Sequence, residues 1–205
     1  MNPAPSNRLS PVPRPGQQLH EVLKALAYFH QATTRTGTPL ELVHGDVNPS
    51  NVLFSGAGEV KLSDYGVTKG HSGAIGPREG VAAGKLHYLS PEQTRGEPLG
   101  PGSDLFAVGI MFHELVLGAH PFPSKSAEPE AVMAAIRAAK LSLPPTVDKP
   151  LARALARALA PDPKARYRTA GEFAADLFRH ALDSNLSRTA KDVQVWLEGT
   201  LELLL

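Results

Sequence analysis

The chain has 205 residues, of which 42% are hydrophobic and 20% charged, and its formal net charge is +1. It is large enough to bury a core, and its charge lacks the basic excess that would favour nucleic acid or an anionic membrane as a partner. The absence of cysteine excludes a disulfide scaffold, a zinc ribbon and a thiol nucleophile, and it fits a cytoplasmic protein.

The amino-terminal half is expected to begin with a flexible segment and continue into a helix and a hairpin. Residues 1–16 contain five prolines and few apolar side chains, which is typical of a flexible lead-in. Residues 51–54 and 59–64 have the pattern of short strands, joined by a glycine-containing turn. From Gln17 to about Gln31, apolar residues recur at helical spacing: Leu19, Val22, Leu23, Leu26, Ala27 and Phe29.

The remainder is expected to be one long surface loop followed by helices. Residues 67–88 are rich in glycine and poor in large apolar side chains, which favours a loop. Residues 104–118 are apolar nearly all round and predict a buried helix, and no export signal or membrane span is expected. Amphipathic helices are predicted over residues 130–140, 149–160 and 169–182, and one more over 187–205, which packs on the domain or binds a partner.

Three side chains between residues 44 and 66 have the chemistry that phosphoryl transfer requires. Asp46 and Asp64 supply carboxylates and Asn51 adds an amide oxygen, a set of hard ligands that suits Mg²⁺. Asp46 is suited to accept the proton of an attacking hydroxyl, and the other two to hold metal against phosphates. A lone Asp is more often a turn or cap residue, but the H-x-D-x-x-x-x-N spacing with Asp-Tyr-Gly thirteen residues later favours catalysis.

These residues belong to a longer series of motifs that resembles a known family. The series resembles the carboxy-terminal lobe of a eukaryotic-like serine/threonine protein kinase, especially the bacterial kind, over residues 17–182. The resemblance implies a mainly α, protein kinase-like fold, with a helical lobe, a small β-hairpin at the catalytic loop and a carboxy-terminal helix over 183–205. The motifs are HGDVNPSNVLF (44–54), VKLSDYG (60–66), GKLHYLSPEQ (84–93), SDLFAVGIMFHELVLGAHPF (103–122) and APDPKARYRTAGEFAADL (160–177).

The resemblance assigns catalytic and metal-binding roles. Asp46 would be the catalytic base, and Asn51 would act beside it in catalysis. Asn51 and Asp64 would also bind the metal and, with Gly66 as the hinge of the metal-binding motif, the nucleotide. The implied cofactors are Mg²⁺ and ATP, and the implied partner is a protein substrate.

The resemblance also assigns structural roles. Glu92 would form a buried ion pair with Arg166, between the substrate loop and the last helices. Asp104 would open the central helix and hold the catalytic loop by hydrogen bonds to its backbone. His44 and Tyr65 would be stacked core residues.

The sequence departs from the family pattern in its nucleotide-binding half. A glycine-rich loop, a strand lysine and the helix glutamate that pairs with it are not found, and Val22-Leu23-Lys24 lies inside a helical stripe. Unaided ATP binding is therefore expected to be weak or absent. A complementing amino-terminal lobe or another partner protein is expected.

A second departure concerns two positions near the transferred phosphate. The family usually places Lys two residues after the catalytic Asp and Thr just after the glycine of the substrate loop, whereas here these positions hold Asn48 and Lys85. We hypothesise a swapped couple, in which Lys85 supplies the catalytic cation that Asn48 cannot. The alternative is a solvated lysine and a turn asparagine.

Three functions remain open from the sequence. The chain transfers the γ-phosphate of ATP to protein Ser or Thr when completed by an amino-terminal lobe, or it is an inactive, pseudokinase-like interaction module. A small-molecule kinase of the aminoglycoside phosphotransferase type is disfavoured, because those enzymes lack the Ser-Pro-Glu substrate loop and the Glu92–Arg166 pairing.

Overall fold

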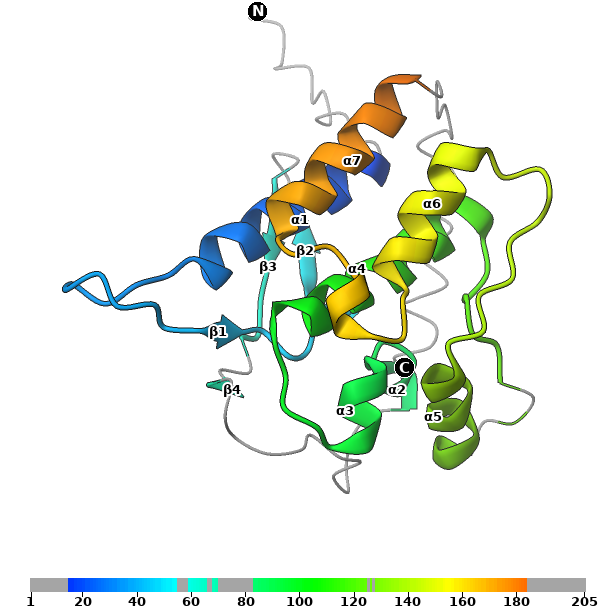
Figure 1. Cartoon of the computed structure of the whole chain (residues 1–205), viewed down its shortest axis with the longest axis horizontal. Coiled ribbons are helices and arrows are strands. Elements are labelled where there is room, and N and C mark those ends of the chain that lie inside the picture. Colours follow the sequence, from blue (N-terminus) through cyan, green and yellow to red (C-terminus); the bar gives the residue numbers. More distant parts are fainter. Residues whose placement is uncertain are drawn as a thin grey trace, which may run out of the picture.

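The computed structural model describes residues 15–54, 59–65, 68–69, 83–124, 126 and 128–183. Most of these residues are helical, and the strands are short (Figure 1). In chain order the elements are α1 (Pro15–His30), β1 (Leu42–Val43), η1 (Pro49–Asn51), β2 (Val52–Phe54), β3 (Val60–Leu62), β4 (Thr68–Lys69), α2 (Ala83–Leu86), α3 (Pro91–Arg95), α4 (Pro101–Leu117), α5 (Pro129–Ala138), α6 (Lys149–Ala158), η2 (Pro163–Ala165) and α7 (Ala170–Asp183).

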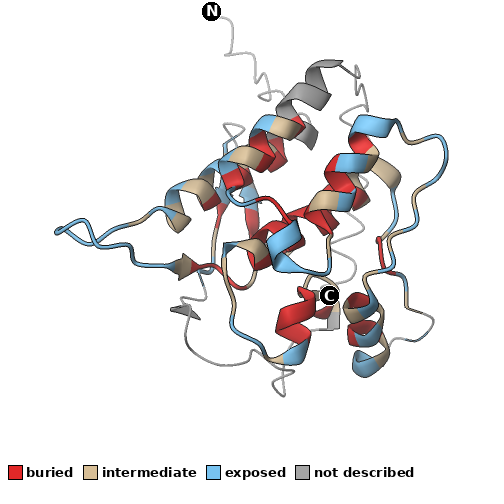
Figure 2. Ribbon diagram, viewed as in Figure 1, coloured by how far each residue is buried: buried red, intermediate tan, exposed pale blue. Residues whose placement is uncertain are grey.

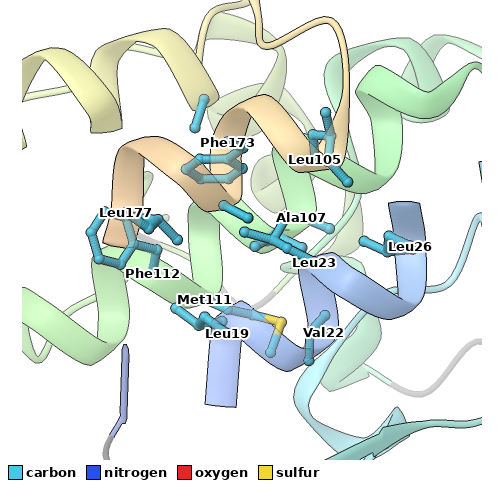
Figure 3. Packing of buried hydrophobic residues seen from close by; sticks show 14 of the residues in the cluster. Leu19, Val22, Leu23, Leu26, Leu105, Ala107, Met111, Phe112, Phe173 and Leu177 are labelled. Atoms are coloured by element: carbon cyan, nitrogen blue, oxygen red, sulfur yellow. The ribbon is translucent and has the colours of Figure 1, made fainter. Parts of the chain in front are cut away.

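The core is built around α4, which runs through the middle of the molecule and is buried along most of its length (Figure 2). The apolar stripe of α1 packs on α4 and α7, as its helical spacing predicts. Phe112 of α4 meets Phe173 of α7 edge to face, with ring centroids 6.4 Å apart. Figure 3 shows the packed side chains, which are Leu19, Val22, Leu23 and Leu26 from α1, Leu105, Ala107, Met111 and Phe112 from α4, and Phe173 and Leu177 from α7.

The helices α4 and α6 approach closely at Gly109. A Cβ added there would lie 3.0 Å from the Cβ of Ala158 and 3.0 Å from Cδ2 of Leu159. Glycine is therefore required by space at this position, because the facing atoms belong to well-packed side chains.

Two antiparallel pairs of strands lie beside the catalytic motif. In β2 and β3, Val52 pairs with Leu62, which confirms the predicted hairpin; its turn, residues 55–58, lies outside the described residues. In β1 and β4, Leu42 pairs with Lys69. The prediction of a continuous loop over 67–88 is wrong at both ends, because β4 and α2 fall within it. Elements of two and four residues are too short to produce a recognisable periodicity.

The helix boundaries differ slightly from the predicted ones. Helix α1 begins at Pro15, two residues before Gln17, because proline is well tolerated in the first turn of a helix. The helix predicted over residues 187–205 lies outside the described residues. Among the described helices, none is long and apolar enough to cross a membrane.

Candidate active site

The loop that carries Asp46 is attached by hydrogen bonds to Asp104, in the first turn of α4. Asp104 is 1% exposed, and its two carboxylate oxygens accept hydrogen bonds from the backbone N–H groups of His44 (2.9 Å) and Gly45 (2.8 Å). The Nε2 of His30, at the end of α1, donates to the same carboxylate at 2.8 Å. A buried carboxylate is stable only with such partners, so these hydrogen bonds tie the loop to the core.

A second attachment ties the loop to α3, and the sequence alone did not indicate it. The Nε2 of Gln93 donates to the backbone oxygen of Gly45 at 2.8 Å. Gln93 also completes the capping box of α3, in which its Oε1 accepts from Ser90 N at 2.8 Å. Gly45 has φ +75°, a left-handed backbone conformation that glycine adopts without strain.

Three side chains donate to the Asp46 carboxylate, which is still partly exposed. Asn48 Nδ2 donates to Oδ1 at 2.9 Å, and Asn51 Nδ2 donates to Oδ2 at 3.0 Å. Lys85 Nζ forms an ion pair with Oδ2 at 2.8 Å. The side chains of Asp46 and Lys85 are 35% and 34% exposed, so both are accessible from solvent. Four of the sequence-selected residues therefore meet at one carboxylate.

Asn51 and Asp64 are brought together by the backbone. The side-chain nitrogen of Asn51 donates to Asp46. The side-chain oxygen of Asn51 is therefore the atom that would bind a metal. Ser63 N donates to Asn51 O at 2.8 Å, which brings Asp64, the residue after Ser63, near Asn51 in space. Asp64 is exposed and has φ +55°, a left-handed conformation that aspartate tolerates better than most residues.

This donor set fits Mg²⁺ bound together with phosphates. Magnesium is typically held by one or two carboxylates plus water and substrate phosphates, and Asp64 with the Asn51 oxygen supplies that kind of set. Among the described residues, no group of three or more His, Cys, Asp or Glu side chains could hold a metal by itself. Gly66, the expected hinge of the metal-binding motif, lies outside the described residues.

An aromatic stack lies next to Asp64 in sequence, at Tyr65. His44 is fully buried; its Nδ1 accepts from Asp46 N at 3.3 Å, and its Nε2 donates to Ser63 O at 3.0 Å. Tyr65 packs on His44 with ring centroids 5.3 Å apart and stacks on Phe29 at 5.0 Å. Tyr65 is nevertheless 47% exposed, so the expectation of a core residue was wrong for it, although the expected contact with His44 is present. Phe29 was expected only as part of an apolar stripe.

Helix α3, which carries Glu92, is anchored by a buried ion pair. Arg166 donates from Nη1 and Nη2 to the two oxygens of Glu92 at 2.7 and 2.8 Å, and both residues are at most 2% exposed. Ser103 Oγ donates to the same carboxylate at 2.8 Å. Burial alone would raise the pKa of Glu92, but the hydrogen bonds and charge of Arg166 outweigh burial, so this pKa lies below its usual value.

A further acidic group underlies the substrate loop and was not selected from the sequence. Tyr88 donates to Glu114 Oε2 of α4 at 2.8 Å, and burial raises the pKa of Glu114 to about 7. A small pocket opens between this loop and the catalytic loop, and Asp46, Lys85 and Tyr88 are among the residues that line it.

Comparison with known proteins gives a consistent result. A family model described as "Protein kinase domain" matches residues 14–181. Tyrosine-protein kinase MasK of Myxococcus xanthus is 34% identical over 181 residues, covering 86% of this chain and 28% of that protein. Serine/threonine-protein kinase PknA of Mycobacterium tuberculosis is 32% identical over 170 residues, covering 78% and 39%. Serine/threonine-protein kinase PrkC of Bacillus subtilis is 32% identical over 165 residues, covering 78% and 24%.

The chain therefore spans well under half the length of these relatives. The match nevertheless includes every motif that meets at the Asp46 loop. Kinase homologues from several bacteria at 32–34% identity extend the same assignment. The chain belongs to the protein kinase domain family.

Proposed function

We propose that the chain forms the catalytic face of a serine/threonine protein kinase and transfers the γ-phosphate of ATP to a protein hydroxyl. The observation that carries this proposal is the Asp46 carboxylate, which is held by Asn48, Asn51 and Lys85 and is still about one-third exposed. A carboxylate fixed in this way is suited to accept the proton of the acceptor hydroxyl. Asn51 and Asp64 would hold Mg²⁺, which, when bound, neutralises charge on the phosphates.

Lys85 is proposed as the cation beside the transferred phosphoryl group. Its Nζ lies 2.8 Å from Asp46 Oδ2, so its positive charge is adjacent to the reacting hydroxyl. A fixed cation at this place stabilises the negative charge that develops during transfer. Lys85→Thr is expected to lower the transfer rate at least about tenfold. Lys61→Thr is the matched control, because Lys61 is 68% exposed on β3 and pairs with Glu59. A Lys85→Thr protein as active as the control would refute this role.

We assign residues 17–182 to the carboxy-terminal lobe of the kinase. The support is the order of the motifs, the helical bundle around α4 and the half-exposed Tyr65 beside the metal-binding residues. The glycine-rich loop and its lysine would then come from an amino-terminal lobe, in the same protein or in a partner. The 205-residue chain alone is expected to bind ATP weakly or not at all.

The test is phosphate transfer from radiolabelled Mg-ATP by the chain joined to the amino-terminal lobe of a related bacterial kinase. Transfer is expected, and Asp46→Ala and Asp64→Ala should each abolish it. Phosphoamino-acid analysis decides the acceptor, because MasK is named a tyrosine kinase whereas PknA and PrkC are named serine/threonine kinases. Transfer that survives Asp46→Ala, or a folded two-lobe protein without transfer, would refute the proposal.

One observation favours a second function, that of a non-catalytic interaction module. Tyr65, which stacks on Phe29, is 47% exposed, and Tyr28, the residue before Phe29, is 85% exposed. A partner that covers the exposed side of Tyr65 would be held by an aromatic side chain. Under this function, Tyr65→Ala would abolish binding of the partner, whereas Asp46→Ala would leave it unchanged.

A further inference from the structure

Asn48 makes contacts that its proposed place in a swapped couple does not explain. It is 2% exposed, and its Nδ2 donates to both the backbone oxygen of Asp46 (3.0 Å) and the carboxylate Oδ1 (2.9 Å). Asn51 makes the mirror-image pair of contacts, to the same backbone oxygen at 2.7 Å and to Oδ2 at 3.0 Å. Two buried amides thus hold the Asp46 carboxylate, one on each oxygen.

The orientation of the Asn48 amide is fixed by Ser50. The backbone N–H of Ser50 donates to Asn48 Oδ1 at 3.0 Å, and the Ser50 hydroxyl donates to the same oxygen. Because the backbone N–H can only donate, it requires the oxygen of the amide, and the NH₂ group must then face Asp46. The same contact makes Asn48 the cap of η1.

We propose that Asn48, locked by Ser50, is a positioning residue for the catalytic base Asp46; this inference rests on the proposed phosphotransfer. Asn51 and Lys85 together occupy Oδ2, whereas Asn48 alone uses Oδ1 among the described contacts. Each carboxylate oxygen accepts about two hydrogen bonds. The remaining capacity of Oδ1 is therefore where the acceptor hydroxyl places its proton.

Position 48 carries a neutral amide, whereas the cation comes from position 85. Lys85 is 34% exposed and therefore stays partly solvated. A neutral donor on Oδ1 also leaves Asp46 with one cation rather than two. The base is thus oriented by two amides and faces a single positive charge.

The decisive variant is Asn48→Asp. Aspartate caps a helix as well as asparagine and keeps an oxygen for Ser50, but it replaces the donor that faces Asp46 by an acceptor. Ser50→Ala removes one donor that locks Asn48, and Ser50→Thr is its conservative control. These variants separate the capping of η1 from the positioning of Asp46.

The first readout is the side-chain amide signals in ¹H–¹⁵N NMR spectra of the 205-residue chain. Asn48 and Asn51 are expected to give protected, dispersed NH₂ signals in the wild type. Asp46→Ala should weaken the protection of both, although their bonds to the backbone oxygen of residue 46 remain, whereas Ser50→Ala should weaken that of Asn48 alone and Ser50→Thr should restore it. An Asn48 amide that exchanges as fast as an exposed asparagine would overturn the proposal, whether or not the protein transfers phosphate.

The second readout is phosphate transfer by the two-lobe protein. Asn48→Asp should lower kcat about 100-fold with little change in the KM for ATP, since a base misplaced by about 1 Å costs this much. An Asn48→Asp protein with wild-type kcat would overturn the positioning role. A wild type without any transfer would refute the proposed function instead, and the NMR comparison would still decide how Asp46 is held.

Discussion

Replacement of Arg166 by methionine is expected to be among the most destabilising single changes in the described part of the chain. The guanidinium is buried at 1% exposure and uses all its nitrogens. It donates to both oxygens of Glu92, and its plane lies over the ring of Phe106 at 4.6 Å from the centroid. The other acceptors are the backbone oxygens of Ala160 (2.7 Å), Gly102 (2.9 Å) and Pro161 (3.1 Å).

The expected loss of stability follows from the Glu92 carboxylate, which Arg166→Met leaves buried without its partner. Methionine fills much of the same volume but leaves the 2% exposed Glu92 carboxylate with Ser103 as its remaining side-chain donor. Removing one partner of a buried ion pair costs about 3–5 kcal/mol. In a chain of this size 1 kcal/mol shifts Tm by about 2–4 °C, so a fall of about 6–20 °C is expected.

The assay is thermal unfolding followed by circular dichroism at pH 7. Arg168→Met is the matched control, because Arg168 is exposed two residues further on, and a change of about 0.5 kcal/mol or less is expected for it. The double variant Glu92→Met/Arg166→Met should recover much of the loss, since an apolar pair of similar volume replaces a buried ion pair at little cost. A drop in Tm of 2 °C or less for Arg166→Met would refute the reasoning.

The same pair predicts how stability depends on pH. The pKa of Glu92 is lower in the folded protein than its ordinary value of 4.5, so its contribution is present above pH 4.5 and is lost as the pH falls below it. In Arg166→Met the carboxyl is buried without its cation, so that variant should lose less stability on acidification. Parallel curves of Tm against pH for the two proteins would contradict the assignment.

Three further predictions concern packing and titration. Gly109→Ala should cost about 1–3 kcal/mol in unfolding experiments, because its Cβ would lie 3.0 Å from that of Ala158, whereas Gly102→Ala, with its nearest contact at 3.7 Å, should be neutral or slightly stabilising. Glu114→Gln should be more stable than the wild type at pH 8, by at most about 3 kcal/mol, because ionising a buried carboxyl of pKa about 7 opposes folding. This advantage should vanish as the pH falls to about 5, and a constant difference would refute it. Burial lowers the pKa of His120, whose Nδ1 accepts a backbone N–H, so stability should fall as the pH drops below 6.5 in the wild type, and His120→Asn should lessen this fall in Tm.

The long elements of the fold could be predicted because they repeat a pattern over several turns. In α1 the apolar residues form a stripe on one face, and in α4 they surround the helix. Both patterns predict burial, which the structure confirms. The strands β1 and β4 and the helix α2 could not be predicted, since they contain two to four residues and depend on neighbours distant in sequence. Their positions are decided by tertiary contacts rather than by local preference.

In the candidate site, too, local sequence patterns could be recognised, whereas contacts between distant residues could not. The spacing of Asp46, Asn51 and Asp64 could be recognised because all three lie within twenty residues of one another. Gln93 could not be recognised as a partner of the catalytic loop, because it contacts residue 45 across 48 positions of sequence and also looks like an ordinary capping residue. Ser50 likewise lacks any signal beyond its place beside Pro49.

Contacts from several elements hold the loop that carries Asp46. Asp104 holds the loop on α4, Gln93 holds it on α3, and Asn48 and Lys85 hold the Asp46 carboxylate itself. All of these contacts arise within residues 45–104, so the Asp46 carboxylate, the proposed base, is held by its own loop and by the segments that follow it. Loss of ATP binding and loss of base geometry should therefore be separable, with Asp64→Ala affecting the first and Asn48→Asp the second. In the proposed kinase, these hydrogen bonds would hold the base in position for phosphate transfer.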